Sequence, residues 1–270
     1  MLAWVIPVGL VIGLSIGALG GGGSILAVPA LVYLFGQDAV AATTTSLLVV
    51  GVTSVIGATP HWRAGRVRLG QGVVFGLLGV AGSFVGSLLS TTVPQEVLLT
   101  AFAGLILVVA ALMTRRRRRE ARAGDQPAQV EPPAVVTWRP RVSVNWRRAA
   151  LVLLTATGVG LLTGFFGVGG GFAVVPALVL ALGLPMPVAV GTSLVVIAIN
   201  SGTALLARAG QDMSLDWALI GWFTLAAVGG GLLGSRVVSR VSPARLNLAF
   251  TVLLVLVAVY TAVRSVPELL

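Results

Sequence analysis

The sequence contains no cysteine and no lysine, and only 10% of its 270 residues are charged. The absence of cysteine excludes disulfide bonds, thiolate metal sites and thiol chemistry. A soluble domain of this length would have about a quarter of its residues charged. The scarcity of charge therefore excludes an ordinary soluble domain, and hydrophobic residues make up 57% of the chain instead.

Long uncharged segments occupy most of the chain. One transmembrane helix needs about 20 mostly apolar residues. Three uncharged segments exceed that length, residues 1–37, 69–95 and 149–207, and two more come close to it, residues 97–114 and 217–235. The sequence therefore predicts a polytopic membrane protein that lies in a lipid bilayer.

The net charge of +10 is concentrated in one segment. Residues 114–148 contain ten arginines and three acidic residues. Cytoplasmic loops of membrane proteins carry such an excess of positive charge. The sequence has no basic face with interleaved aromatic residues on a soluble domain, so no nucleic-acid partner is expected. We predict a cytoplasmic, mostly disordered linker over 114–148.

The two halves of the chain contain a sequence repeat. Residues 17–54 align with residues 164–201 at a constant offset of 147, and 16 of the 38 aligned pairs are identical. A weaker match, one residue out of step, pairs Gly82 with Gly230 and Gly86 with Gly234. Many membrane transporters contain internal repeats of this kind.

Each half is predicted to contain five apolar segments. They cover about 2–19, 24–36, 39–59, 70–90 and 96–113 in the first half, and 149–167, 172–183, 187–207, 216–235 and 243–263 in the second. The second segment of each half follows a glycine run and, as a helix, is too short to cross a hydrocarbon core of about 30 Å. We therefore expect the first two segments to form a re-entrant hairpin, with one long helix as the alternative.

The arginine distribution predicts the topology. Loops 60–69 and 236–245 are rich in arginine and should be cytoplasmic, whereas 91–95 and 208–216 should lie outside. Equivalent loops of the two halves then face opposite sides. The predicted fold is an all-α polytopic membrane protein with two inverted repeats, 1–113 and 149–270. Each repeat has a glycine-broken, re-entrant-type helix pair and three transmembrane helices.

The glycine turns and the hydroxyl groups that follow them form the candidate substrate site. A glycine turn frees backbone N–H groups, and a helix N-terminus after it attracts anions. Close helix packing is the alternative role for the glycines, and bonding to the helix's own carbonyls is the alternative for the hydroxyls. The predicted substrate-binding residues are Gly20, Gly22, Gly23, Ser24, Thr45, Ser46, Gly167, Gly169, Gly170, Gly171, Thr192, Ser193 and Asn200.

No charged side chain or histidine is expected in the middle of a span. His61 and Arg208 fall at the ends of apolar segments, so we expect His61 at the membrane interface and Arg208 in a loop. The membrane segments offer no metal-ligand set and no acid–base pair. We therefore predict neither an enzyme nor a bound cofactor.

Both glycine-rich segments end in Val-Pro, at 17–29 and 164–176, and a Thr-Ser-Leu follows each of them. In these motifs the sequence resembles the sulfite exporter TauE/SafE family of bacterial membrane proteins. The resemblance implies export of sulfite, or of a related small sulfonate or organosulfur anion, across the inner membrane. A channel or carrier for another solute, and a membrane assembly factor, are the alternatives; homodimer formation is open.

Overall fold

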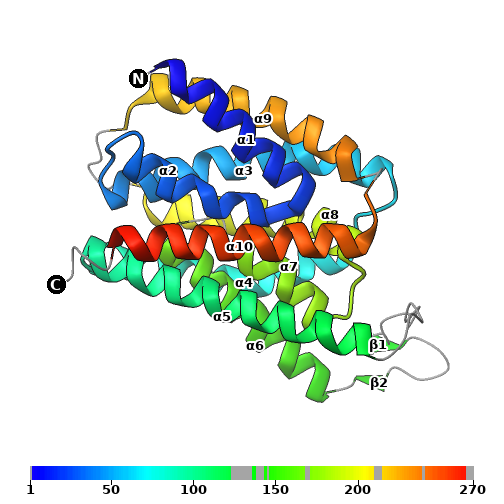
Figure 1. Cartoon of the computed structure of the whole chain (residues 1–270). Coiled ribbons are helices and arrows are strands. Elements are labelled where there is room, and N and C mark those ends of the chain that lie inside the picture. The colour runs from blue at the N-terminus through cyan, green and yellow to red at the C-terminus, as the bar shows by residue number, and fades with distance from the viewer. Residues whose placement is uncertain are drawn as a thin grey trace.

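The computed structural model describes residues 2–122, 136–137, 143–144, 146–167, 171–209, 215–238 and 241–265. Helices form nearly all of this part of the chain (Figure 1). The first half contains α1 (Leu2–Leu19), the 3₁₀ helix η1 (Gly20–Leu26), α2 (Ala27–Tyr33), α3 (Ala39–Arg63), α4 (Leu69–Ser90) and α5 (Gln95–Arg122). The second contains α6 (Trp146–Phe166), α7 (Gly171–Leu180), α8 (Met186–Ala207), α9 (Trp217–Val238) and α10 (Pro243–Ser265). The all-α fold class is confirmed.

Six segments of the described chain are long and apolar enough to cross a membrane. They are Trp4–Tyr33, Ala39–Arg63, Leu69–Ser90, Met186–Ala207, Trp217–Val238 and Pro243–Tyr260. Large apolar side chains also cover the outside of the bundle; Leu154 and Leu206 are 73% and 76% exposed. Soluble proteins rarely expose large continuous apolar areas, so this surface is suited to lipid.

The first of these segments is a hairpin, as predicted, and not one long helix. The chain reverses at Gly20, whose φ of 64° lies in the left-handed region that favours glycine. Beyond the turn, Gly23 packs directly on the backbone of Ser15 and Ile16 in α1. Figure 1 shows α2 running back from the end of α1. Gly167 has a φ of 62° at the corresponding turn after α6.

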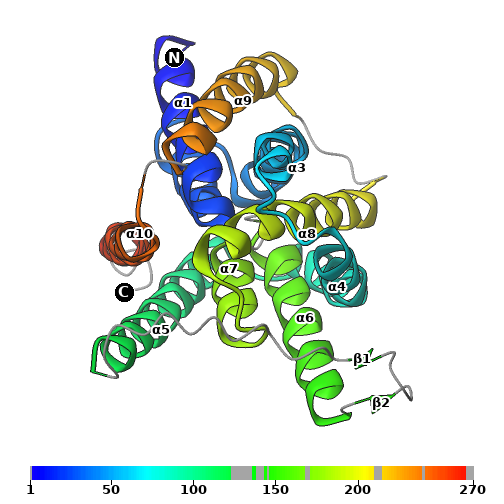
Figure 2. The same cartoon turned by 90° about the vertical axis from the view of Figure 1, so that its right-hand side faces the viewer.

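The two halves pack against each other because helices of the first half pair with helices of the second half. α1 packs on α9 as α6 packs on α4, and α3 packs on α8 as α5 packs on α10. The contacts match in detail, because Gly13 lies against the backbone carbonyl of Ala227 and its equivalent, Gly160, lies against that of Gly79. Figure 2 shows α7 and α8 near the middle of the molecule and α5 and α10 towards its edge.

Each half runs from one end of the molecule to the other. The start of α1 and the end of α10 lie at the same end in Figure 1, on the left. The end of α5 and the start of α6 lie at the opposite end, beside the two short strands β1 (Val136–Thr137) and β2 (Ser143–Val144). The halves therefore follow opposite directions through the molecule.

The linker differs from the prediction where the structure describes it. Helix α5 does not stop before the arginine run but continues through it to Arg122. Arginine is a good helix former, so the helix extends into polar surroundings beyond its apolar part. Strands β1 and β2 pair antiparallel, with Val136 opposite Val144. The predicted disorder of 123–135, 138–142 and 145 concerns residues outside the described part of the chain.

Candidate functional site

Helices α3 and α8 cross at the centre of the molecule. A Cβ on Gly51 would lie 3.3 Å from the Ser201 β-carbon, and one on Gly57 would lie 3.9 Å from Leu194 Cδ1. These two contacts show that the helices run in opposite directions. The Asp38 side chain caps α3 by accepting hydrogen bonds from two backbone N–H groups at 2.9 Å, and Pro185 precedes α8.

Polar side chains without hydrogen-bond partners gather along these two helices. Thr53 and Ser54 on α3 are equivalent to Asn200 and Ser201 on α8, and all four are at most 1% exposed. Within the described part of the chain, neither their hydroxyl groups nor the Asn200 amide has a partner. An unsatisfied buried polar group costs about 1–3 kcal/mol. A fold that retains four of them at its centre is suited to a polar ligand or to water there.

Thr45 and Ser46 extend this group along α3. Both are fully buried, and both hydroxyls also lack a partner among the described residues. At about 100° per residue, the hydroxyls of Thr45, Ser46, Thr53 and Ser54 spread over about half of the circumference of α3, with Thr45 and Ser54 on opposite sides. The alternative that a hydroxyl bonds its own helix holds for Thr43 and Thr44, which donate to the Val40 carbonyl, and for the predicted site residue Ser193, which donates to the Val190 carbonyl over 2.8 Å.

The tip of the first hairpin reaches α8 in the other half. A Cβ on Gly20 would lie 2.6 Å from Ser193 Oγ. The backbone N–H of Gly21 donates to the same oxygen over 3.4 Å. Gly21 also packs against the backbone of Gly171 at the start of α7, so the two hairpins meet. The structure thus brings a glycine turn and a predicted hydroxyl together across the repeat.

Three other predicted residues have packing roles in the same tip. Gly22 lies against the Phe250 ring, and Gly23 lies against the backbone of α1. Ser24 Oγ donates to the Gly21 carbonyl over 2.6 Å. These contacts hold the hairpin closed, as the packing alternative for the glycines requires.

The remaining predicted residues are more scattered. Thr192 Oγ1 accepts a hydrogen bond of 3.0 Å from the Arg68 backbone N–H, so it anchors the connection between α3 and α4. Gly167 packs against Thr43 in α3. Gly169 and Gly170 lie outside the described residues.

Arg208 is buried, in contrast to its predicted place in a loop. It follows the last residue of α8 and is 2% exposed. Its guanidinium donates to four hydroxyl groups and one carbonyl: Ser87 Oγ at 2.8 Å, Thr43 Oγ1 at 2.7 Å, Thr44 Oγ1 at 2.8 Å, Ser90 Oγ at 2.7 Å and the Gly164 carbonyl at 3.3 Å. Among the described residues, no carboxylate contacts it.

The positive charge of Arg208 is therefore held by neutral groups. The hydroxyls that accept from it donate their own protons elsewhere; Ser87 donates to the Ala204 carbonyl and Ser90 to the Ser87 carbonyl. A buried charge normally requires a partner of opposite sign. An anion beside this end of the α3–α8 pair would supply it.

His61 is also buried among the helices, and its expected position at the membrane interface stays a prediction. Helix α3 continues past it to Arg63, and its side chain is 0% exposed. Its Nε2 lies 2.9 Å from the Gly17 carbonyl oxygen, whereas its Nδ1 has no partner among the described residues. A Cβ on Gly191 would lie 3.1 Å from the His61 β-carbon. His61 therefore packs against α8 at the residue that directly precedes Thr192 and Ser193.

His61 and Arg208 occupy equivalent positions in the two halves. They are separated by 147 residues, as are Gly17 and Gly164, the residues whose carbonyls they contact. Extending the repeat seven residues beyond Ser54 and Ser201 would have identified this pair. The antiparallel crossing of α3 and α8 puts the two side chains at opposite ends of the buried hydroxyls.

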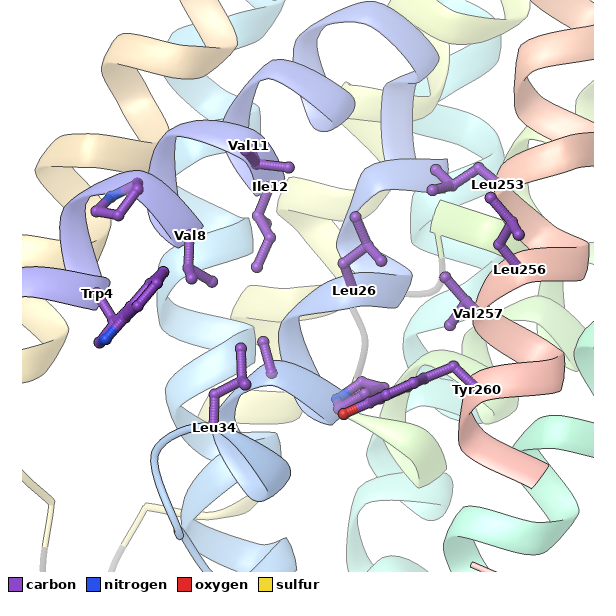
Figure 3. A pocket seen from close by; sticks show the side chains of 13 residues that line it. Trp4, Val8, Val11, Ile12, Leu26, Leu34, Leu253, Leu256, Val257 and Tyr260 are labelled. Carbon is purple, nitrogen blue, oxygen red and sulfur yellow. The ribbon is translucent and has the colours of Figure 1, made fainter. Parts of the chain in front are cut away.

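A separate apolar groove lies between α1, α2 and α10 (Figure 3). Its volume is about 530 Å³, and it is lined by Trp4, Pro7, Val8, Val11, Ile12, Leu26, Pro29, Ala30, Leu34, Leu253, Leu256, Val257 and Tyr260. These side chains offer almost no hydrogen-bond donors, so the groove is unsuited to a small anion.

The arrangement combines an uncharged polar centre with a cationic end and a histidine end. No cluster of three or more histidine, aspartate or glutamate side chains occurs in the part of the chain that the structure describes, so it presents no metal centre. Hydroxyls and an amide can donate to an anion, and Arg208 adds a permanent positive charge. The site is suited to transient binding of a small anion.

Comparison with known proteins agrees with a transport role. The model of the family described as "Sulfite exporter TauE/SafE" matches residues 5–261. A probable membrane transporter protein of Xylella fastidiosa is 32% identical over 95% of this chain and 93% of its own length. The probable membrane transporter protein YdhB of Bacillus subtilis is 28% identical over 72% of this chain and 73% of its own length. No solved structure matches significantly.

Proposed function

Because the chain belongs to the TauE/SafE sulfite exporter family of membrane transporters, we propose that it exports sulfite or a related small sulfonate across the bacterial inner membrane. The family name supports sulfite, and the unpartnered hydrogen-bonding groups at the centre support an oxyanion. The anion is bound along α3 and α8 by the unpartnered hydroxyls and by Asn200.

The observation that carries this proposal is the set of buried polar groups without partners. Thr45, Ser46, Thr53, Ser54 and Ser201 each hold a hydroxyl that lacks a partner among the described residues. A hydroxyl can rotate its proton towards an oxyanion. Because these donors carry no full charge, they bind an anion without holding it so strongly that release is slow. Gly20 and Gly21 bring the first hairpin to the same helix pair.

Arg208 supplies the long-range attraction in this proposal. A single positive charge in a site of low dielectric constant acts on an anion over a longer distance than a hydroxyl does. Its hydroxyl cage keeps it in place when no anion is present. The anion therefore approaches the Arg208 end and moves along the hydroxyls towards the His61 end, or in the reverse direction.

The transport cycle we propose depends on two inverted repeats. The opposite directions of the two halves through the molecule, and the arginine-rich loops 60–69 and 236–245, support this topology. The linker after α5 is then cytoplasmic, and rocking of one repeat against the other exposes the centre to each side in turn.

Liposomes that contain the purified protein test the substrate directly. Radiolabelled sulfite should cross the membrane in a saturable manner, methanesulfonate should compete, and a monovalent cation of similar size should not. The matched control is Thr155→Val, because Thr155 Oγ1 bonds the Leu151 carbonyl of its own helix away from the site. Saturable flux of a neutral solute that sulfite does not affect would contradict the proposal.

Cysteine labelling tests the topology, because the chain has no cysteine of its own. Single cysteines at 93, 125, 212 and 241 can be labelled with an impermeant maleimide from either side. Residues 93 and 212 should react from outside, and residues 125 and 241 from the cytoplasm. Labelling of 93 and 241 from the same side would refute the inverted repeat while leaving the substrate untouched.

A further inference from the structure

The two equivalent buried groups, His61 and Arg208, differ in one property that matters for an anion. The guanidinium of Arg208 is permanently charged, and all five of its N–H groups have acceptors. Among the described residues, the imidazole of His61 has a hydrogen-bond partner at one nitrogen only. Histidine is the side chain that ordinarily changes charge between pH 5 and 8. The His61 end of the site therefore has a positive charge only when a proton is bound.

We propose that His61 is the proton-binding residue of the transporter, and that one proton on its Nδ1 accompanies each anion in the same direction. This inference rests on the proposed function, because it requires an anionic substrate. No covalent bond changes: the Nδ1 lone pair takes up a proton from the aqueous phase on one side and releases it on the other.

The hydrogen-bond geometry assigns the two ring nitrogens. A backbone carbonyl oxygen can only accept, so the nitrogen 2.9 Å from the Gly17 carbonyl must be the N–H donor. In the neutral ring this leaves Nδ1 with a lone pair, and that atom is buried and has no partner among the described residues. Protonation would turn Nδ1 into a second donor without disturbing the bond from Nε2.

The partners of the ring connect it to the parts expected to move. Gly17 lies in the last turn of α1, one turn before the chain reverses at Gly20. Gly191 on α8 touches the His61 β-carbon and directly precedes Thr192 and Ser193, and Ser193 in turn accepts from Gly21. The histidine thus joins the base of the hairpin, the tip of the hairpin and the helix that carries half of the site.

The charges around His61 determine the sign of the coupling. The adjoining segments α1, η1 and α8 contain no titratable side chain, and the titratable residue of α2 is Tyr33, which stacks on Tyr260 of α10. α9 contributes Arg236, and the segment that follows His61 contributes Arg63, Arg66 and Arg68. The surrounding charges are therefore cationic, and they oppose a further positive charge on the ring. An anion nearby offsets this repulsion, so anion and proton should bind together, and each should increase the affinity for the other by the same factor.

Nuclear magnetic resonance can observe this proton directly, because His61 is the only histidine in the chain. Protein labelled with ¹⁵N-histidine and purified through a tag without histidine will give signals from this ring alone. We expect the ring to change its protonation state in a pH titration of the folded protein, and saturating sulfite to raise the titration midpoint by about half a pH unit or more. A ring that stays neutral at every pH at which the protein is folded, or one whose midpoint does not respond to sulfite, would overturn the proposal.

Transport by variants in liposomes provides the second test. The initial rate of sulfite transport by the wild-type protein should rise about tenfold when the pH on the side from which His61 takes its proton is lowered from 8 to 6. His61→Gln keeps a hydrogen-bonding side chain but cannot take the proton, so it should lose this response, whatever rate it retains. Sulfite itself titrates in this range, and this contribution to the pH response is the same for all variants. The difference between the wild type and His61→Gln therefore measures the contribution of His61. The Thr155→Val control should respond to pH like the wild type.

The outcomes separate the two proposals. If the wild-type protein moves no sulfite, the proposed substrate is wrong, and the NMR titration in the absence of sulfite still tests whether His61 binds a proton. If the wild type moves sulfite and His61→Gln responds to pH as the wild type does, the transport role stands and the proton role of His61 is refuted.

Discussion

The two ends of the α3–α8 pair are built on one plan and completed differently. At one end Arg208 reaches the Gly164 carbonyl, and at the other His61 reaches the equivalent Gly17 carbonyl. The helices and glycine contacts around them repeat closely. The two ends therefore share their helix packing and differ in their charged groups: in our proposal, one end is permanently charged and the charge of the other depends on pH.

The residues around Arg208 also differ from the residues at the equivalent positions around His61. Thr43, Thr44 and Ser90 hold the guanidinium of Arg208. At the equivalent positions of the other half stand Val190, Gly191 and Val238. A cation buried without carboxylates needs several neutral acceptors, whereas a neutral imidazole does not. The hydroxyl cage is therefore present only where the charge is permanent.

The largest expected effect comes from removing the permanent charge. Arg208→Gln should lower sulfite transport by on the order of 100-fold or more, since hydrogen bonds from charged groups contribute about 1.5–3 kcal/mol each. Arg208→Lys retains the charge but has three donors instead of five, so it should retain more transport than Arg208→Gln. Flux in liposomes at equal protein content measures both. Equal loss in the two variants would mean that the hydrogen-bond geometry matters and the charge does not.

The second largest effect is expected when His61 is replaced by the arginine that occupies the equivalent position at the other end of the α3–α8 pair. His61→Arg alone should destabilise the protein by about 3–5 kcal/mol, because it buries a cation without acceptors. Adding Val190→Thr and Val238→Ser provides two of the missing hydroxyls and should recover part of that loss. Thermal unfolding in detergent measures the stability, and transport by the triple variant should keep only the pH dependence that comes from the titration of sulfite itself. If the added hydroxyls give no recovery, the cage does not explain why arginine occurs at only one end.

Substitution of the equivalent glycines should have the same effect on stability in both halves, whereas substitution of His61 and of Arg208 should have different effects. Gly13→Ala and Gly160→Ala each place a methyl group against the backbone of a facing helix. Each should cost about 1–3 kcal/mol of stability, as overpacking commonly does. Gly158→Ala is the control on the same helix as Gly160, because nothing lies within 4 Å of its Cβ. It should be neutral or stabilising by up to about 1 kcal/mol.

The smallest effects are expected from the hydroxyls at the helix crossing. Ser54→Ala and Ser201→Ala should each raise the KM for sulfite about two- to tenfold, the loss of one hydrogen bond of about 0.5–1.5 kcal/mol. Neither should lower stability, because neither hydroxyl has a partner in the described part of the chain. Thr203→Val, whose hydroxyl bonds the Ile199 carbonyl of its own helix, is the control. An unchanged KM in both serine variants would exclude these hydroxyls from the site.

Sequence patterns anticipated the helices better than the site. Apolar length and the repeat predicted the membrane helices within a few residues, except for the C-terminal end of α5, and the glycine run predicted the hairpin. The short second arm began later than expected, because the chain forms the 3₁₀ helix η1 before α2, and Pro29 falls in the first turn of α2. Proline needs no N–H acceptor at that position, so it marks the true start of this arm.

The burial of His61 and Arg208 was missed for a physical reason. Hydropathy assigns polar residues at the end of an apolar segment to a loop or to the membrane surface. It contains no information on which helix end folds inward against the partner repeat. Both residues turn inward because α1 and α6 end beside them and offer a carbonyl. The hydroxyls of Thr43 and Thr44 then accept hydrogen bonds from the guanidinium. The hydroxyls of Thr45 and Ser46, the next two residues, have no hydrogen-bond partner among the described residues.

The exchange of helices between the repeats has a consequence for biosynthesis. α1 finds its main packing partner, α9, about 200 residues later in the chain. At about 5–20 residues per second, the ribosome completes that partner roughly 10–40 s after α1 has entered the membrane. During this interval the glycine-lined side of α1 faces lipid or the insertion machinery. A nascent chain stalled before α9 should therefore be recognised by membrane quality-control proteases, even though every helix of the first half has been made.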